Sequence, residues 1–160
     1  LRFINRGHDY KTFLDAVSVT INRGISVGAH LIVGFPTETR EEMLHMADEI
    51  SGLHLDFLKI HQLQVVKDTP MAEMYKENPF HTFEYEEYLN FVVDFIERLS
   101  PEIVLQRLFA TAPDDILIAP RWDRSRHQIT KDIQQRFIRR DTFQGKKYKG
   151  QGVMAPLSAL

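Results

Sequence analysis

A single stretch, residues 29–42, constrains the fold of this chain more than any other, because it combines a strand, a corner and a helix start. Residues 31–33 are apolar without a break, as expected for a parallel strand that is buried on both faces. Gly34 permits a close backbone approach or a positive φ, and Pro36 cannot continue a hydrogen-bonded ladder. We therefore predict a buried strand that ends in a tight turn.

A helix start follows this turn. Thr39 and Glu42 have the spacing of a capping box, so a helix is expected from about residue 40 to Ser51. The carboxyl ends of parallel strands are where α/β proteins bind ligands, but corners of this kind occur in all of these proteins. Two further signals favour a ligand site. His30 is polar inside an apolar strand, and the polar segment 5–8 stands just before the first helix.

Helices and strands alternate along the rest of the chain. Apolar spacing predicts further helices near residues 10–21, 70–76, 83–99 and 126–140, and strands at 25–33, 56–66 and 103–108. Such alternation indicates an α/β fold with about three parallel strands, joined by right-handed crossovers, and helices on the outer face only. Three strands are too few to close a barrel. We therefore expect a bare sheet edge near Ile25, which pairs with another chain or is covered by the C-terminal tail.

The strand at 56–66 carries the second group of candidate functional residues. Leu58 and Ile60 alternate with Lys59 and His61, so the two polar side chains share one face. That face is expected to line a concave, polar cavity, because a buried lysine and histidine are costly without partners. The alternative is a buried polar pair matched by a nearby carboxylate. On the last helix, Ile129, Ile133, Phe137 and Ile138 are expected to form the apolar side.

Charge divides the chain into an acidic body, residues 1–120, and a basic extension, residues 121–160. The body carries 10 Lys and Arg against 19 Asp and Glu, whereas the extension carries 10 against 3. A basic extension suggests an anionic partner, such as RNA or a phosphate group. The alternative is a solvated helix that docks on its own acidic body.

Four segments then appear in a characteristic order: Asn5 to Asp9, His30 to Pro36, Lys59 to Leu63, and Asp68 to Ala72. In this order the chain resembles the C-terminal half of radical S-adenosylmethionine (SAM) enzymes, and in particular an uncharacterised bacterial iron–sulfur oxidoreductase family. It is more distantly similar to oxygen-independent coproporphyrinogen oxidases and to the Elongator-type tRNA-modifying catalytic subunit. The resemblance extends to about Tyr148. It implies the C-terminal half of a partial (β/α) TIM-like barrel that is followed by the extension.

The resemblance implies roles for particular residues. Arg6 stands where an arginine contacts the methionyl group of SAM, and a guanidinium fork suits a carboxylate. His30 stands where a side chain reaches the ribose. The alternatives are a surface arginine that caps a helix end and a core histidine bonded to a backbone carbonyl. The resemblance also implies that Ile32 and Gly34 lie where the strand packs against the adenine of SAM. Backbone groups of Gln64 and Val65, after the next strand, are implied to meet the adenine edge. Lys59 and His61 are the candidates for the substrate side, and no catalytic residue is assigned.

The departures from the family pattern are also informative. The chain has no cysteine, so the Cys-x-x-x-Cys-x-x-Cys loop that holds a 4Fe–4S cluster is absent, and His30 replaces the usual first glycine. His30 and His61 lack a third ligand, so we predict no metal site within the chain. The resemblance thus implies SAM and a 4Fe–4S cluster whose ligands lie outside this chain, in a missing N-terminal half of the barrel. The chain starts at Leu1 and is expected to be a fragment, inactive alone.

Other functions and the location follow from the same observations. No apolar run approaches the ~20 residues of a membrane span, and nothing in the sequence points to secretion, so we expect a cytoplasmic protein. The edge strand allows a homo-oligomer. The alternative function is a nucleic-acid or protein-binding module that uses the basic extension.

Overall fold

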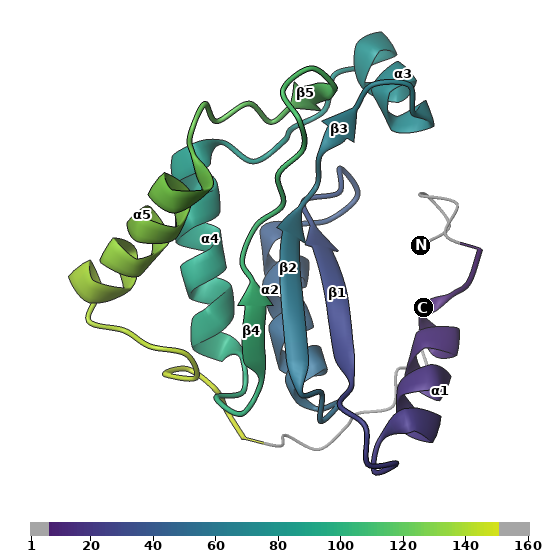
Figure 1. Ribbon diagram of the computed structural model, residues 1–160, viewed down its shortest axis with the longest axis vertical. Coiled ribbons are helices and arrows are strands. Elements are labelled where there is room, and N and C mark those ends of the chain that lie inside the picture. Colours follow the sequence, from purple (N-terminus) through teal and green to yellow (C-terminus); the bar gives the residue numbers. More distant parts are fainter. Residues whose placement is uncertain (1–6, 151–160) are drawn as a thin grey trace.

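The computed structural model of the chain describes residues 7–150 (Figure 1). Helix and strand alternate over the first four elements, and then a further strand, two helices, two strands and a last long helix follow. The helices are α1 (Tyr10–Thr20), α2 (Arg40–Ser51), α3 (Pro70–Glu77), α4 (Tyr85–Arg98) and α5 (Arg126–Arg139). The strands are β1 (Gly28–Val33), β2 (Phe57–Gln62), β3 (Val65–Val66), β4 (Val104–Arg107) and β5 (Leu117–Ala119).

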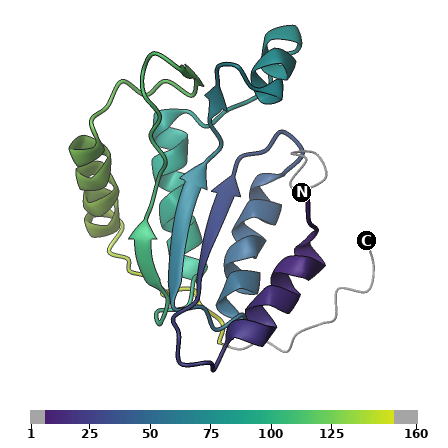
Figure 2. The same ribbon diagram turned by 45° about the vertical axis from the view of Figure 1, so that its right-hand side comes forward.

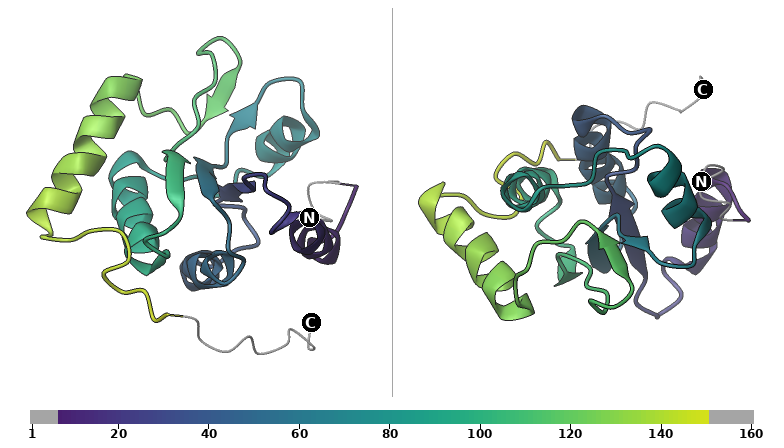
Figure 3. Two further views of the ribbon diagram at one scale, coloured as in Figure 1. Left: turned by 60° about the horizontal axis from the view of Figure 1, so that its bottom comes forward. Right: turned by 90° about the horizontal axis from the view of Figure 1, so that it is seen from above.

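The main sheet confirms the predicted architecture. Its three strands are parallel in the order β1-β2-β4, so β2 is central and β1 forms one edge. Helices α2 and α4 cover one face of this sheet, whereas no helix of the described residues covers its other face (Figures 1 and 3). Figure 2 shows α1 standing beyond the free edge of β1. The fold is thus an open α/β half-barrel.

Local capping explains where the helices begin. Asp9 and Thr39 accept hydrogen bonds from the backbone three residues on, and the Glu42 side chain completes the predicted capping box at α2. Thr69 caps α3, with Pro70 at its first position. Ser125 caps α5 in the same way. Four of the five helix starts therefore follow from short polar side chains that the sequence displays.

The core lies between the sheet and α2 and α4. Leu58 and Ile60 of β2 and Val33 of β1 are fully buried on the helix-covered face. The predicted inward face of α4 is confirmed, since its large side chains are buried at Tyr88, Phe91, Val92 and Phe95, with Leu99 just beyond the helix. At roughly 1.5–3 kcal/mol for each fully buried apolar side chain, this layer dominates the stability of the half-barrel.

Three predicted details are wrong, each for a physical reason. The strand predicted at 56–66 ends at Gln62, and residues 65–66 pair instead antiparallel with β5 in a separate two-stranded sheet. The first strand begins at Gly28 rather than residue 25, because the Val27 N–H bonds the Asp56 carboxylate before the ladder starts. Ile138 is 77% exposed, because at about 3.6 residues per turn it lies on the opposite side of α5 from the buried Ile129.

Within residues 7–150, no helix combines the length and the apolar character that a membrane crossing requires.

Candidate functional site

The open face of the sheet carries polar side chains at matched positions of neighbouring strands. In the parallel register, His30 stands opposite Lys59, and Ile32 stands opposite His61. Arg107 of β4 follows beside Lys59. Because Leu58 and Ile60 are fully buried in the helix layer, the alternate residues of β2 face the open side. The predicted division of β2 into an apolar and a polar face is therefore confirmed.

His61 is the most constrained polar side chain on this face. Its ring centroid lies 5.7 Å from that of His30, in an edge-on arrangement. Its Nε2 atom is buried and bonds no other residue in the described part of the chain. Burial, together with the charges of Arg107, His30 and Lys59, holds the pKa of His61 below its ordinary value of 6.5. The lowered pKa keeps the imidazole mainly neutral at pH 7.

The corner after β1 is built around Gly34. This residue has φ +94°, and a Cβ there would lie 2.9 Å from two ring carbons of Phe83. The Gly34 and Phe35 N–H groups both donate to the Glu38 carboxylate, at 3.2 Å each. Burial raises the pKa of Glu38, although these backbone bonds act in the opposite direction. The glycine thus has a packing requirement of its own, independent of any ligand.

A groove of about 400 Å³ runs along the free edge of β1, between this strand, α1 and α2. Its lining includes His30, Ile32 and Phe35 from the strand and corner, Phe13 from α1, and Met46 from α2. Apolar side chains therefore flank an edge strand that pairs with no other strand on that side within residues 7–150. Such a groove suits an extended segment that adds a further strand to the sheet.

A second cavity, of about 640 Å³, lies at the carboxyl ends of β2 and β4, and we call it the strand-end pocket. Gln62 fixes one wall, because its amide both donates to the Ala110 carbonyl (2.9 Å) and accepts from the Ala110 N–H (2.8 Å). The opposite wall is the segment that leads into α5. That wall contributes three cationic side chains, namely Arg121, Arg124 and Arg126.

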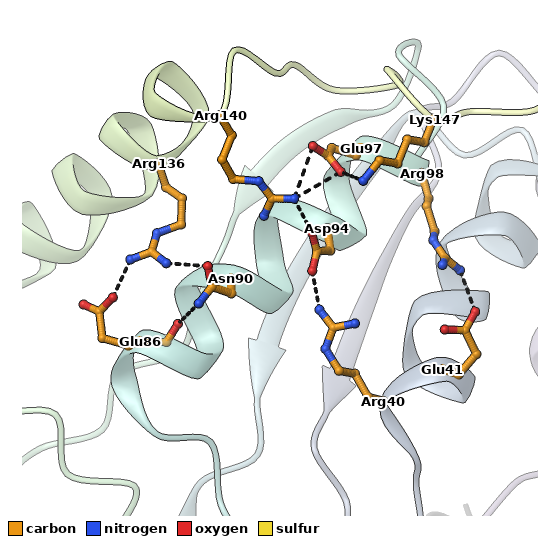
Figure 4. Close-up of polar contacts among 10 residues, drawn as sticks. All are labelled: Arg40, Glu41, Glu86, Asn90, Asp94, Glu97, Arg98, Arg136, Arg140 and Lys147. Atoms are coloured by element: carbon orange, nitrogen blue, oxygen red, sulfur yellow. Dashed lines mark hydrogen bonds and ion pairs between the residues drawn. The ribbon is translucent and has the colours of Figure 1, made fainter.

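The basic extension docks on the acidic body through α4 (Figure 4). Arg140 pairs with Asp94, which also pairs with Arg40 of α2. Arg140 also lies 3.5 Å from Glu97, and Lys147 forms an ion pair with the same carboxylate. The Glu97 side chain is only 4% exposed, so this contact is largely shielded from solvent.

Neighbouring contacts extend the same interface. Arg136 bonds both Glu86 and Asn90. Gln144 donates to the backbone carbonyls of Ser100 (2.7 Å) and Ile103 (2.8 Å). Arg136, Arg140 and Lys147 of the extension are thus paired with carboxylates of α4, as the hypothesis of docking on the acidic body predicts.

The structure separates the cofactor residues that the sequence suggests. His30 and Ile32 line the edge groove, whereas Gln64 lines the strand-end pocket. Val65 is fully buried and pairs with Ala119. Arg6 lies outside the described residues. The SAM-binding roles of these residues and of Gly34, and the substrate-side roles of Lys59 and His61, stay predictions.

Sequence reasoning missed several residues of these cavities. Arg107 reaches the polar face only because a register irregularity follows Leu58 in the pairing of β2 and β4. The three arginines of the strand-end pocket are visible in sequence only as part of the basic extension, without a signal that sets them apart. The amide pairing of Gln62 links residues 48 positions apart and has no local signature.

Comparisons with known proteins agree with this geometry. Residues 55–139 match the family described as the Radical_SAM C-terminal domain. An uncharacterised protein of Methanocaldococcus jannaschii is 36% identical over 92% of this chain, which corresponds to 46% of that protein. The uncharacterised protein YtqA of Bacillus subtilis is 30% identical over 91% of the chain and 45% of its own length. The chain thus spans about half the length of these relatives.

A solved structure shows the same fold. The archaeal Methanocaldococcus infernus Elp3 with an N-terminal deletion matches with a TM-score of 0.77 and 19% sequence identity, over 90% of this chain and 34% of the other. At this identity the match shows the fold alone. It agrees with the expected C-terminal half of a partial barrel.

Proposed function

Because the chain belongs to the Radical_SAM C-terminal domain family, we propose that it forms the C-terminal half of the catalytic barrel in a radical SAM enzyme. The observation that carries the proposal is the open polar face of a parallel sheet whose other face is buried under helices. In such sheets, the crevice at the carboxyl ends of the strands binds the ligand. SAM held beside a reduced 4Fe–4S cluster would supply the radical chemistry that removes a hydrogen atom from a substrate.

The residues of this chain fit SAM and do not fit the cluster. A 4Fe–4S cluster needs cysteine thiolates, and the chain contains none, so the cluster ligands belong to another part of the longer protein. The open face offers what a nucleoside requires. Ile32 gives an apolar floor for a base, and His30 stands two residues before it on the same face of β1.

In this proposal each residue has a limited task. His30 holds the ribose and Arg6 holds the methionyl carboxylate. Ile32 and Gly34 lie under the adenine, and only backbone groups of Gln64 and Val65 meet its edge, because the Val65 side chain is buried. Lys59 and His61 face the substrate, and the neutral imidazole of His61 can accept a proton from it. The N-terminal half of the longer protein supplies a strand that pairs with the free edge of β1 and extends the barrel wall. A second copy of the chain paired at the same edge is the alternative partner.

The basic extension supports a binding function less well. An RNA-binding module needs accessible cations, yet Arg136, Arg140 and Lys147 are committed to carboxylates of α4. We therefore place the enzyme proposal first. Binding of RNA or of another anion is assigned only to cations outside this interface.

The proposal is tested on the reconstituted full-length protein under anaerobic conditions. With dithionite as reductant, release of 5′-deoxyadenosine is followed together with the absorbance of the cluster. Arg6→Ala and His30→Ala should reduce the release about tenfold or more, since each removes a polar contact to SAM. His127→Ala, which removes an exposed histidine on α5, should leave it unchanged.

Two results would contradict the proposal. Unchanged release in Arg6→Ala and His30→Ala would remove these residues from the site. Failure of the full-length protein to assemble a cluster under strict anaerobic reconstitution would exclude the radical SAM reaction.

A further inference from the structure

The arginines of the strand-end pocket are held differently from those that fasten α2, α4 and α5 to one another. Arg40, Arg98, Arg136 and Arg140 each pair with a carboxylate. Arg121, Arg124 and Arg126 form no ion pair anywhere in residues 7–150 and bind neutral partners instead. Their positive charges are therefore positioned but not compensated by a contacting carboxylate.

The neutral partners fix each guanidinium and leave part of its donors unused. Arg121 donates to the carbonyls of Leu117 and Asp114 through one nitrogen. Arg126 donates to the Thr111 hydroxyl through two nitrogens. A guanidinium has five N–H groups in a planar fork, so both retain free donors. This is the arrangement of a pre-organised anion site, in which the protein holds the cations in place before the ligand arrives.

Arg124 is held differently but with the same result. Its guanidinium carbon lies 5.5 Å from the ring centroid of Tyr85, and one nitrogen bonds the Asp123 carbonyl at 3.3 Å. Arg124 stands just before Ser125, the cap of the 14-residue helix α5. The partial positive charge of a helix N-terminus thus adds to that of the three side chains around the pocket.

Carboxylates are also present at the pocket, and they restrict the ligand. Asp114 and Asp123 line it, although neither forms an ion pair in the described part of the chain. Ionised carboxylates only accept hydrogen bonds, so a bound molecule must offer donors as well as negative charge. The Gln64 amide at the floor can serve either kind of group. A simple anion such as phosphate would bind the arginines of this lining but leave the two carboxylates without a hydrogen-bond donor.

The combination points to one class of ligand. Two to three guanidiniums suit a phosphate monoester, which carries between one and two negative charges at pH 7 and binds arginine forks in a bidentate manner. Sugar hydroxyl groups supply the donors for the two carboxylates. The volume of about 640 Å³ lies within the ordinary range for small-molecule sites. We infer that the strand-end pocket binds a small phosphorylated sugar, with the phosphate on Arg121, Arg124 and Arg126 and the hydroxyl groups on Asp114 and Asp123.

This inference deepens the proposed function, because it names the substrate class at the mouth of the half-barrel, but binding can be tested without the radical reaction. Trp122 is the only tryptophan of the chain and lines the pocket, so its fluorescence reports occupancy directly. The full chain is titrated at constant ionic strength with ribose 5-phosphate, inorganic phosphate and ribose. We expect saturable signals with affinity in the order ribose 5-phosphate, phosphate, ribose.

Two sets of variants separate the two halves of the site. Arg121→Gln combined with Arg126→Gln should weaken ribose 5-phosphate and phosphate binding about tenfold or more. Asp114→Asn combined with Asp123→Asn should weaken ribose 5-phosphate and leave phosphate unchanged or tighter. The matched control is Lys131→Gln with Arg139→Gln, which removes two exposed positive charges of α5 outside the pocket. Arg126→Lys keeps the positive charge but removes the two hydrogen bonds to Thr111, so it shows whether lost binding comes from the lost charge or from a loosened Thr111 loop.

The outcomes are distinct. Absence of a saturable signal, or an equal loss in the control pair, would overturn the inference, since the latter would mean non-specific attraction. Tighter binding of oligouridylate than of ribose 5-phosphate, with loss in the arginine variants, would show a nucleic-acid site and also overturn it. These titrations use neither a reductant nor a cluster, so their failure would not affect the test by release of 5′-deoxyadenosine. Failure of that release would likewise not affect the binding test.

Discussion

Replacing Glu97 by glutamine should detach the basic extension from the body at its most buried contact. The carboxylate accepts a 2.6 Å hydrogen bond from Thr142 Oγ1 and faces both Arg140 and Lys147. Removal of one partner from a buried ion pair costs about 3–5 kcal/mol. Here the two cations are 31% and 55% exposed and can regain water, and Asp94 still holds Arg140. We therefore expect a loss of about 2 kcal/mol in the free energy of unfolding.

The measurement is urea unfolding of the full chain, with Glu86→Gln as the matched control. Glu86 also pairs with an arginine of α5, but its side chain is 70% exposed, so the control should lose only about 0–0.5 kcal/mol. Proteolysis at Lys146 and Lys147 should accelerate in Glu97→Gln and not in the control. Equal losses in the two variants would refute the reasoning, because burial would then contribute nothing to the contact.

The same contact has a predictable pH dependence. Burial alone would raise the pKa of Glu97, but hydrogen bonds from Lys147 and Thr142 and the charge of Arg140 outweigh it and hold the pKa below 4.5. The ion pair therefore contributes fully above pH 4.5, and its contribution is lost as the pH falls from there through the lower pKa of the folded state. In Glu97→Gln this part of the acid destabilisation should be missing. A variant with an unchanged acid limb would contradict the assignment.

Two further predictions concern the corner and the open face. Gly34→Ala should lower the free energy of unfolding in urea by about 2–4 kcal/mol, because Gly34 has φ +94° and a Cβ there would lie 2.9 Å from Phe83. The control Gly24→Ala, at φ +75° with open space around it, should cost only about 1–2 kcal/mol. Equal costs would contradict the packing argument. His61 should titrate below pH 6.5 by NMR. Arg107→Gln should raise this midpoint without reaching 6.5, because burial contributes more to the lowered pKa than the charge of Arg107 does. A midpoint at or above 6.5 in the native chain would disprove the burial of this ring. Since the folded state binds this proton more weakly, His61 should also make the fold less stable as the pH falls through 6.5.

Helices and strands that are determined by residues close together in the sequence could be predicted from it. Helix α2 has its cap, its apolar stripe and its end within 14 residues, so its predicted bounds are confirmed. The alternation along β2 likewise fixed which residues enter the core. What sequence could not give is pairing at a distance. Val65 leaves the main sheet because residues more than 50 positions later offer it an antiparallel partner. No local pattern marks that choice.

The basic extension shows the same limit in its charges. The sequence contains ten cationic residues in the extension but does not indicate which of them pair with carboxylates. The fold divides them, because the far half of α5 lies against the acidic surface of α4 whereas the approach to α5 lies over the strand ends. One group of arginines therefore fastens the extension, and the other is held by neutral atoms beside a cavity. In our proposal, a single charged segment thus serves both the stability of the half-barrel and the recognition of an anion at the strand ends.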